Sequence, residues 1–268
     1  MTGPVDIVVC GAAGRMGRRI VALAAEDARV RVVGAIEARG NATVGKDAGT
    51  LAGTGASGVK VGDDLAAIAS PGAVIVDFTS AESSLGHLRV AAGKRAPIVI
   101  GSTGFTAAQR TEAERLAAGT ATLIAPNMSL GVNVLLGLVE EAAHRLGPAF
   151  DCEIVELHHG RKKDAPSGTA LALGEAAARG KGLDAKQAFR LERAGMTGER
   201  PRGEIGIFAL RGGDAVGDHT VFFAGTGERV ELTHRATSRD CLASGALHAA
   251  VWLAGRKAGL YSMRDVLS

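Results

Sequence analysis

The sequence predicts an α/β protein in which a first domain, built on a parallel sheet, is joined to a second, α+β domain with a mixed or antiparallel sheet. Three observations support this prediction. Short apolar runs alternate with helical stretches over the first half of the chain, which is typical of βαβ crossovers. A glycine cluster follows the first apolar run. Beyond Asn127 the apolar runs grow longer and alternate in polarity, as strands with one covered face do.

The elements of the first domain follow from apolar runs and helical composition. The run Val5–Cys10 is short and apolar and predicts a strand, whereas Arg15–Ala25 contains few β-branched residues and predicts a helix. The same reasoning gives the later elements. Further strands are expected at Val30–Ile36, Val74–Phe78, Ile98–Ile100 and Thr122–Ile124, and further helices at Ala81–Gly93 and Ala107–Ala118.

The second domain is expected to open with one long amphipathic helix, Val132–Leu146. The polar, glycine-punctuated segment Gly180–Gly203 predicts a loop or a short excursion, and the helical run Leu242–Ala258 is expected to return to the first domain. The predicted domains are therefore residues 1–129 with 240–268, and residues 130–239. Strands are expected at Ile154–His158, Ile205–Arg211, His219–Ala224 and Arg229–Thr237, with a helix at Gly168–Arg179.

Composition excludes several classes of function. The 268 residues carry 31 Lys+Arg and 28 Asp+Glu, so there is no single-sign field for nucleic acid or a membrane surface. Aromatic residues make up only 3%, which disfavours a protein that stacks bases. Cys10, Cys152 and Cys241 lie too far apart for a disulfide framework or a metal motif. A cytoplasmic protein without a metal site is expected.

The first glycine cluster, Gly11-Ala12-Ala13-Gly14-Arg15-Met16-Gly17, lies between a predicted strand and a predicted helix. Glycines there allow a tight turn, close approach of backbone N–H groups to a pyrophosphate, and packing of the helix on the strand. Glu37 ends the second strand, where an acidic side chain accepts hydrogen bonds from ribose hydroxyls, and Arg39 follows it. The first domain is therefore predicted to be a Rossmann-like dinucleotide-binding domain.

Two further turns follow later strands of the same domain. They are Gly101-Ser102-Thr103-Gly104-Phe105 and Ala125-Pro126-Asn127-Met128-Ser129. Because the carboxyl ends of parallel strands meet at one edge of the sheet, where open α/β sheets bind ligands, both turns are expected beside the glycine cluster. There they would frame a nicotinamide ring and its ribose.

The stretch Glu156–Thr169 has the highest density of reactive and charged side chains in the chain, with two adjacent histidines and three successive cationic residues. Neighbouring strand residues point to opposite faces, so His158 and His159 are not expected to bind one metal ion together. One histidine beside Lys162 suits acid/base work on an anionic substrate. Ser167 is a predicted N-cap that leaves backbone N–H groups for a carboxylate at Gly168 and Thr169. The alternative is a solvated basic loop with a capping serine.

With these residues in view, the chain resembles the 4-hydroxy-tetrahydrodipicolinate reductase family, also called dihydrodipicolinate reductases, of the lysine and diaminopimelate pathway. The run His-His-x-x-Lys-x-Asp-Ala-Pro-Ser-Gly-Thr, here His158–Thr169, is highly specific for that family. The resemblance spans nearly the whole chain. It is also carried by Gly11–Gly17, Glu37, Asp77-Phe78-Thr79, Gly101–Phe105, Asn127-Met128-Ser129 with Gly131-Val132-Asn133, and Arg239–Ala246.

The resemblance implies reduction of a small cyclic dicarboxylate by hydride from NADH or NADPH, in a homotetramer joined through the sheets of the second domain. It makes His158 the general acid and Lys162 its catalytic partner. It assigns the substrate carboxylates to His159, Lys162, Gly168 and Thr169. It assigns the cofactor to Gly11, Ala12, Ala13, Gly14, Arg15, Met16, Glu37, Gly101, Ser102, Thr103, Ala125, Pro126, Asn127 and Met128.

Cofactor preference depends on the residues after Glu37. Family members that use NADPH well often have a basic residue next, whereas this chain has Ala38 and places Arg39 one position later. Use of both cofactors is expected, with NADH at least as good, because a carboxylate favours free hydroxyls and repels a phosphate.

Three other functions stay open at this point. They are a paralogous oxidoreductase acting on another unsaturated dicarboxylate, a dinucleotide sensor without catalysis, and another two-domain dehydrogenase. An aspartate-semialdehyde type dehydrogenase would need a nucleophilic cysteine, and none of the three cysteines has a supporting motif.

Overall fold

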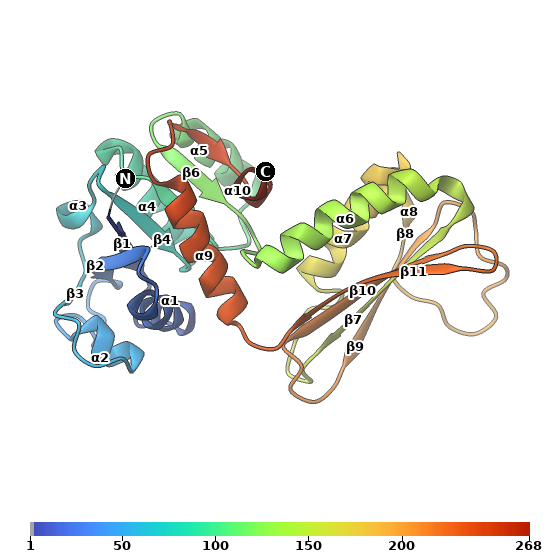
Figure 1. The fold of residues 1–268 in the computed structure, drawn as a ribbon, viewed down its shortest axis with the longest axis horizontal. Coiled ribbons are helices and arrows are strands. Elements are labelled where there is room, and N and C mark those ends of the chain that lie inside the picture. Colours follow the sequence, from blue (N-terminus) through green and yellow to red (C-terminus); the bar gives the residue numbers. More distant parts are fainter. Residues whose placement is uncertain (1–2) are drawn as a thin grey trace. The chain divides into compact units, whose positions relative to one another are not determined.

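The computed structural model describes residues 3–268 and falls into two compact units (Figure 1). The first unit contains the described residues up to Leu130 together with Asp240–Ser268, and the second is Gly131–Arg239. Residues 1 and 2 of the predicted first domain lie outside the described residues. The second unit is therefore an insertion within the sequence of the first.

The first unit is built on a seven-stranded parallel sheet in the order β12-β6-β5-β4-β1-β2-β3. The central strands are almost entirely apolar because helices cover both faces of the sheet. The strands are β1 (Val5–Cys10), β2 (Val30–Ile36), β3 (Val61–Gly62), β4 (Ala73–Asp77), β5 (Ile98–Ile100), β6 (Ala121–Ile124) and β12 (Gly259–Tyr261).

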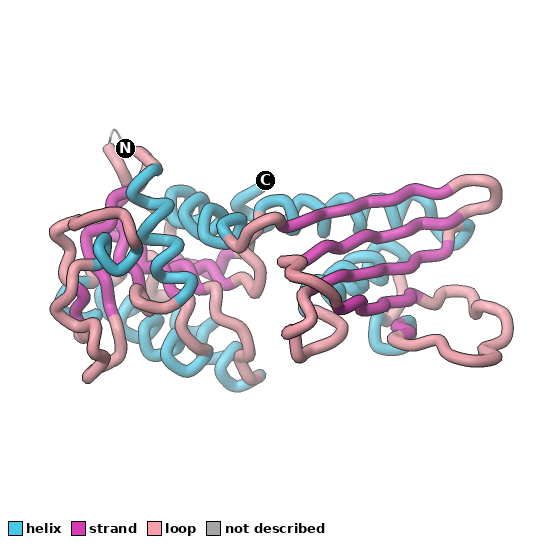
Figure 2. The backbone as a smooth tube through the Cα atoms, turned by 90° about the horizontal axis from the view of Figure 1, so that it is seen from below, coloured by secondary structure: helices cyan, strands magenta, loops and turns pink. Residues whose placement is uncertain are grey.

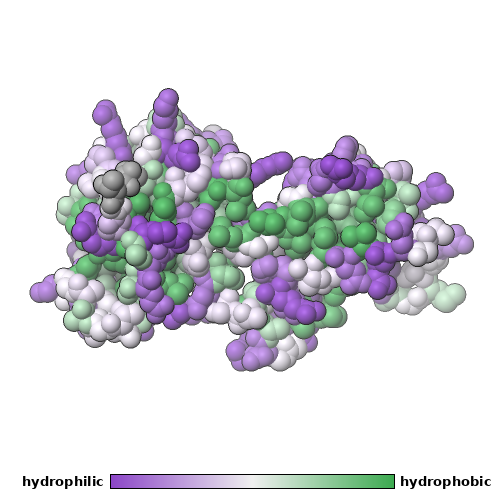
Figure 3. All heavy atoms as spheres, in the orientation of Figure 1, coloured by the Kyte–Doolittle hydropathy of each residue, from purple (hydrophilic) through white to green (hydrophobic). Residues whose placement is uncertain are grey.

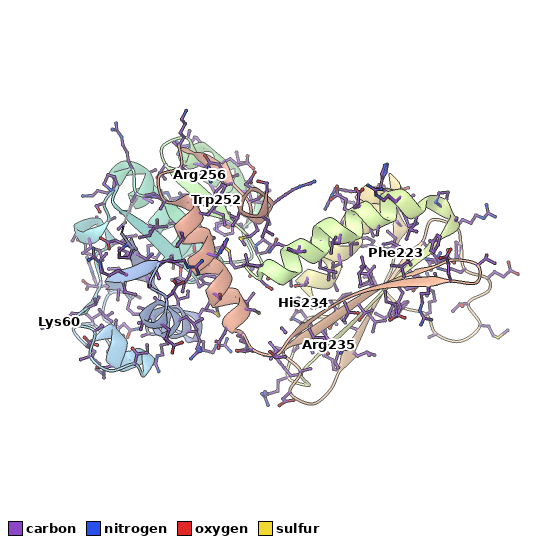
Figure 4. All side chains as sticks on the ribbon, viewed as in Figure 1. Lys60, Phe223, His234, Arg235, Trp252 and Arg256 are labelled. Carbon is purple, nitrogen blue, oxygen red and sulfur yellow. The ribbon has the colours of Figure 1, made fainter. Side chains whose placement is uncertain are left out.

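Helices pack on both faces of this sheet. Residues of α1 and α9 form one core with Ile7, Val9 and Val76, while residues of α4 and α5 form another with Val8 and Ile75. The long helices are α1 (Arg15–Glu26), α4 (Ala81–Lys94), α5 (Ala107–Ala117) and α9 (Asp240–Leu253), and the short ones are α2 (Ala48–Ala52), α3 (Leu65–Ile68) and α10 (Met263–Leu267). The guanidinium carbon of Arg256, just after α9, lies 4.1 Å from the centroid of the Trp252 ring on α9 (Figure 4).

The second unit contains a five-stranded mixed sheet in the order β11-β10-β7-β9-β8. Strand β10 pairs antiparallel with β7 and β11, and β9 pairs parallel with β7 and β8. The strands are β7 (Asp151–His158), β8 (Phe189–Arg190), β9 (Ile205–Arg211), β10 (Gly217–Ala224) and β11 (Arg229–Ala236). The helices are α6 (Leu130–Leu146), α7 (Gly168–Lys181) and α8 (Ala185–Ala188), with a 3₁₀ turn at Gly147–Ala149.

Helices α6 and α7 cover one face of this sheet, which we call the covered face. Cys152, Ile154 and Phe223 (labelled in Figure 4) pack there against Leu173 of α7 in a third core. No helix among the described residues covers the opposite, open face, along which the strands lie exposed in Figure 2. Leu210 on that face is 52% exposed. Hydrophobic residues also gather over α6 (Figure 3).

The predicted fold class is confirmed: a Rossmann-like parallel sheet is followed by a mixed-sheet α+β unit. The predicted helix Leu242–Ala258 is wrong in its last five residues, because α9 ends at Leu253 and β12 then pairs with β6 at the edge of the parallel sheet. Gly255, with a φ of +76°, breaks the helix. The predicted loop 180–203 contains the end of α7, α8 and β8. No helix among residues 3–268 is both long and apolar enough to cross a membrane.

Candidate active site

The glycine turn joins the end of β1 to the start of α1. Gly11 has a φ of +71°, which glycine adopts without strain, and the N–H groups of Gly11 and Ala12 donate to the carbonyl of Ile36 at 2.8 and 3.1 Å. The N-cap residue Gly14 has no side chain to occupy the first turn of α1. The bonds to Ile36 fix the turn, and the backbone N–H groups left for a ligand are those of the first residues of α1, at the positive end of the helix dipole, an arrangement that binds phosphate groups.

Gly17 lets α1 lie directly against the turn. A Cβ atom on Gly17 would lie 2.1 Å from the carbonyl oxygen of Gly11 and 2.7 Å from Cα of Ala12. Both are backbone atoms, so no side-chain rotation relieves the overlap. The third glycine of the cluster is thus required for packing.

Glu37 follows β2 and reaches back to the glycine turn. Its Oε1 atom accepts a hydrogen bond from N of Ala13 at 2.8 Å, and its Oε2 atom accepts one from Nδ2 of Asn41 at 3.1 Å. Glu37, Arg39 and Gly11 help to line a cavity of about 650 Å³, a size suited to a small ligand. The carboxylate therefore both fixes the turn and borders the cavity beside it.

The turns after β5 and β6 lie at the same carboxyl edge of the sheet. A Cβ atom on Gly101 would lie 2.2 Å from the ring of Phe78, so the turn after β5 packs closely on the residue that follows β4. Ser102 is buried and its Oγ accepts a hydrogen bond from Ser84 at 2.7 Å. Ser102, Thr103 and Pro126 help to line a second cavity of about 440 Å³.

The predicted cofactor residues thus gather at one sheet edge, but they do not all offer side chains to a ligand. Ala12, Ala125 and Met128 are at most 5% exposed and pack in the core of the first unit, so only their backbone atoms can face a ligand. Asn127 uses its Oδ1 to accept from N of Ser129 at 2.9 Å. Arg15 is exposed at the start of α1.

In the second unit, charged and polar side chains lie together at the carboxyl end of β7. Strand alternation places Glu156 and His158 on the covered face, and Arg211 of the neighbouring β9 lies on the same face. Nδ1 of His158 lies 2.5 Å from Oε2 of Glu156. Arg211 donates to both carboxylate oxygens, at 2.8 and 2.9 Å, and N of Ser167 donates to Oε1 at 3.0 Å. The strand ends therefore hold a buried Arg–Glu–His chain.

Glu156 is a fully buried carboxylate. Burial alone would raise the pKa of its carboxyl group, but hydrogen bonds from Arg211, His158 and the backbone of Ser167 outweigh it and lower the pKa. The group is consequently charged at neutral pH, and it faces both the guanidinium of Arg211 and the ring of His158.

His219 of β10 lies edge-on to His158, with ring centroids 5.2 Å apart. Burial, reinforced by repulsion from His158, lowers the pKa of His219 to about 4, so its ring is neutral at pH 7. Nε2 of His219 lies 3.0 Å from Oγ of Ser167, the N-cap residue of α7. On β11, His234 lies on the covered side and Arg235 on the open side (Figure 4).

Lys162 lies in the loop between β7 and α7, and its side chain is 19% exposed. Nζ of Lys162 lies 2.8 and 2.9 Å from the two carboxylate oxygens of Asp164, whose carbonyl accepts from Arg211 at 2.7 Å. At the far end of this loop, α7 begins at Gly168. Nδ1 of His159 is buried without a hydrogen-bond partner among the described residues. The loop thus combines a cation, an imidazole and a helix N-terminus, which together suit an anion.

Sequence reasoning assigned no role to Glu156, Arg211 or His219. The two-residue spacing of Glu156 and His158 within a strand is a usable signal, because it puts both side chains on one face. Arg211 and His219 carry no such signal. They lie 55 residues after Glu156 and 52 residues after Ser167, and only the pairing of the strands brings them together.

Comparison with known proteins covers nearly the whole chain. Residues 5–128 match the family described as "Dihydrodipicolinate reductase, N-terminus", and residues 131–267 match "Dihydrodipicolinate reductase, C-terminus". The chain is 51% identical over 263 residues to the 4-hydroxy-tetrahydrodipicolinate reductase of Geobacter metallireducens, covering 98% of each chain. It is 53% identical to that of an Anaeromyxobacter species, covering 98% of this chain and 97% of the relative.

Solved structures share the fold. A dipicolinate-bound dihydrodipicolinate reductase from Paenisporosarcina sp. TG-14 is similar with a TM-score of 0.76 and 22% identity, covering 97% of each chain. An amine dehydrogenase from Mycobacterium smegmatis is similar with a TM-score of 0.60 and 16% identity, covering 97% of this chain and 95% of the other. Different chemistries therefore share this two-unit architecture.

Proposed function

This chain belongs to the dihydrodipicolinate reductase family, and from that membership we propose that it reduces 4-hydroxy-tetrahydrodipicolinate to tetrahydrodipicolinate with NADH or NADPH, in lysine and diaminopimelate biosynthesis. The observation that carries the proposal is the segment His158–Thr169, which carries two histidines, Lys162 and the N-terminus of α7, within a chain half identical to reductases of that name over its full length. A catalytically silent sensor would not need this segment.

The first unit suits a dinucleotide. Gly11 takes the positive φ that the turn needs, Gly17 lets α1 lie directly against the turn, and Glu37 borders the adjoining cavity at the N-terminus of α1. When bound, the reduced nicotinamide supplies a hydride. We assign its binding to the turns after β1, β2, β5 and β6, and Arg39 borders the cavity where a ribose phosphate would lie.

His158 serves as the general acid in this proposal. Hydride addition to a conjugated imine leaves electron density that a proton must quench, and an imidazolium beside a buried carboxylate holds such a proton at Nε2. Lys162, His159 and the first residues of α7, Gly168 and Thr169, bind the substrate carboxylates. Oriented cations and helix dipoles are most effective where charge develops.

We also propose the division of labour between the units. Residues 1–129 with 240–268 bind the dinucleotide, and residues 130–239 bind the substrate and assemble the protein into a homotetramer. The open face of the second sheet supports this assembly, because it carries half-buried Val155, Leu157 and Phe222 beside the more exposed Leu210. A cytoplasmic setting fits a soluble dicarboxylate substrate, and light scattering of the purified protein measures the assembly.

The test is a coupled assay. The unstable substrate is generated from pyruvate and aspartate semialdehyde by its synthase, and the absorbance of NADH or NADPH is followed for the native chain and for His158→Gln. Rapid oxidation that falls at least 100-fold in the variant is expected. A native protein that binds both cofactors and oxidises neither contradicts the proposal and favours a paralogue with another substrate or a sensor.

Both cofactors are proposed to support turnover, with NADH at least as effective. Glu37 accepts from free ribose hydroxyls and repels a 2′-phosphate, while Ala38 adds no compensating charge. Comparing kcat/KM for the two cofactors checks this point. A preference for NADPH above about tenfold, roughly 1.4 kcal/mol, would show that Arg39 overrides Glu37.

A further inference from the structure

We propose that Glu156, held by Arg211, is a positioning residue for the general acid: it fixes His158 as the Nδ1–H tautomer and balances the charge of the imidazolium, so that the transferable proton stands at Nε2. This inference rests on the function proposed above. It extends it by two residues, neither of which is assigned to substrate or cofactor.

The tautomer follows from the donors around Glu156. Arg211 and the backbone N–H of Ser167 can only donate, and between them they supply three hydrogen bonds to the carboxylate. A carboxylate can only accept, so the 2.5 Å contact with Nδ1 of His158 requires a proton on Nδ1. The remaining ring nitrogen, Nε2, must then carry any proton that leaves.

The surroundings of Nε2 support this assignment. Gly217 is the first residue of β10, the strand next to β7. A Cβ atom on Gly217 would lie only 2.9 Å from Nε2 of His158. Glycine therefore leaves room at the nitrogen that the proposal makes reactive. The adjacent ring of His219 has a hydroxyl partner, Oγ of Ser167, rather than a carboxylate. Of the two rings, which meet edge to face, His158 is the one with a carboxylate beside it.

Among residues 3–268, the charged and titratable groups of this cluster come from three strands and one loop. Glu156 on β7 and Arg211 on β9 form the buried pair, His219 on β10 is neutral, and Lys162 with Asp164 forms a second pair in the following loop. Glu156 is the carboxylate in direct contact with the ring. Replacing it with glutamine removes the compensating charge and turns one acceptor oxygen into a donor that faces other donors.

Arg211 acts on two parts of the site. It donates to Glu156 through Nη1 and Nη2 and also to the carbonyl of Asp164, in the loop that carries Lys162. Arg211→Lys keeps a charge but cannot make the bidentate contact. It should raise KM for the substrate as well as lower kcat, whereas Glu156→Gln should act mainly on kcat.

The first experiment measures the native protein, because a variant at Glu156 can fail to fold. Long-range ¹H–¹⁵N spectra report the histidine tautomers, and His158→Gln identifies the resonance of His158. Neutral His158 is expected with its proton on Nδ1. A neutral ring protonated on Nε2 overturns the proposal.

The second experiment compares pH profiles of kcat and kcat/KM for native protein, Glu156→Gln, Glu156→Asp and Arg211→Lys. Glu156→Gln should lower kcat at least tenfold and move the alkaline limb of the profile toward lower pH, with cofactor affinity within twofold of native. Glu156→Asp restores the charge and should return the limb toward its native position. The matched control is Glu112→Gln, which breaks a bidentate Arg–Glu pair with Arg89 between α4 and α5 of the first unit and should leave kcat unchanged.

The outcomes separate this inference from the proposed function. If the native protein is active and Glu156→Gln keeps native kcat and the native pH profile, Glu156 does not position the acid. If the native protein does not turn over the substrate, the proposed function fails, and the tautomer then decides the inference. Loss of the Nδ1–H tautomer in Glu156→Gln would still support it, and an unchanged tautomer would overturn it.

Discussion

The two candidate sites of this chain are built in different ways. At the glycine turn of the first unit, the absence of side chains on Gly11, Gly14 and Gly17 makes close packing possible. The groups offered to a ligand there are backbone N–H donors. At the end of β7 in the second unit, the side chains of Glu156 and His158 form the site, together with others from β9 and β10.

This difference determines how each site fails. A backbone site depends on close approach, so it is disturbed by added atoms. A side-chain site depends on a buried network, so it is disturbed when one partner is removed and the others are left unpaired.

Replacing Lys162 with methionine should separate the sites most strongly. The variant removes the cation of the loop between β7 and α7 and should lower kcat/KM by about 10³-fold, roughly 4 kcal/mol. Cofactor affinity, measured by titration, should stay within twofold because the glycine turn is untouched. Lys163→Met, at the exposed neighbouring position, is the control and should retain near-native activity. A loss of cofactor affinity in Lys162→Met would argue against independent sites.

Acid should weaken the two units in different pH ranges. The folded pKa of His219 is about 4, below its ordinary 6.5, so the unfolded chain binds a proton first and stability is lost as pH falls from 6.5 to 4. His219→Gln should remove on the order of 3 kcal/mol of this loss. The free energy of unfolding, measured by denaturant at several pH values, provides the check.

Asp47 in the first unit supplies the contrast to His219. Hydrogen bonds from the backbone of Ser57, Thr50 and Gly58 lower its pKa to about 2, so its contribution is lost only as pH falls from about 4 to 2. Asp47→Asn should therefore change the pH dependence only below pH 4. Curves for both variants that run parallel to the native curve would contradict this assignment.

Gly17→Ala should damage the backbone site through packing. The added Cβ overlaps the carbonyl of Gly11, so α1 must shift, at a cost of about 1–3 kcal/mol in stability and a tenfold or greater loss of cofactor affinity. Gly93→Ala in α4, where nothing lies within 4 Å, is the matched helix control and should be neutral or stabilising. Native cofactor affinity in Gly17→Ala would show that the turn adapts more than its geometry suggests.

Gly217→Ala should produce the smallest effect, on the side-chain site alone. Its Cβ would press on Nε2 of His158, a ring that can shift slightly, so kcat should fall severalfold while cofactor affinity holds. Gly225→Ala, beyond the other end of β10, creates a similar contact with the ring of Phe150 at 2.8 Å, away from the site. Equal kcat values in the two variants would contradict the role given to Gly217.

The same contrast explains what could be predicted from the sequence. The glycine turn is continuous in the chain, so Gly11–Gly17 and the following helix could be recognised together. The fold class likewise followed from local periodicity, because each βαβ crossover is local. Residues His158, Lys162 and the start of α7 belong to one segment and could also be singled out as a group.

What could not be predicted depends on pairing between distant segments. Arg211 reaches Glu156 only because β9 lies parallel to β7 in a particular register, and no short-range pattern encodes that register. The edge strand β12 was missed for a similar reason. Gly259–Tyr261 is too short to be recognised alone and becomes a strand by pairing with β6.

The discontinuity of the first unit has a consequence for synthesis on the ribosome. Helix α9 and strand β12 complete the parallel sheet, yet they are translated after all of residues 131–239. Until α9 is synthesised, the apolar side chains of β4, β5 and β6 that it covers in the folded protein stay exposed in the nascent first unit. The second unit is continuous and can close its own core as soon as it emerges. The usual order, in which the amino-terminal domain matures first, is thereby reversed.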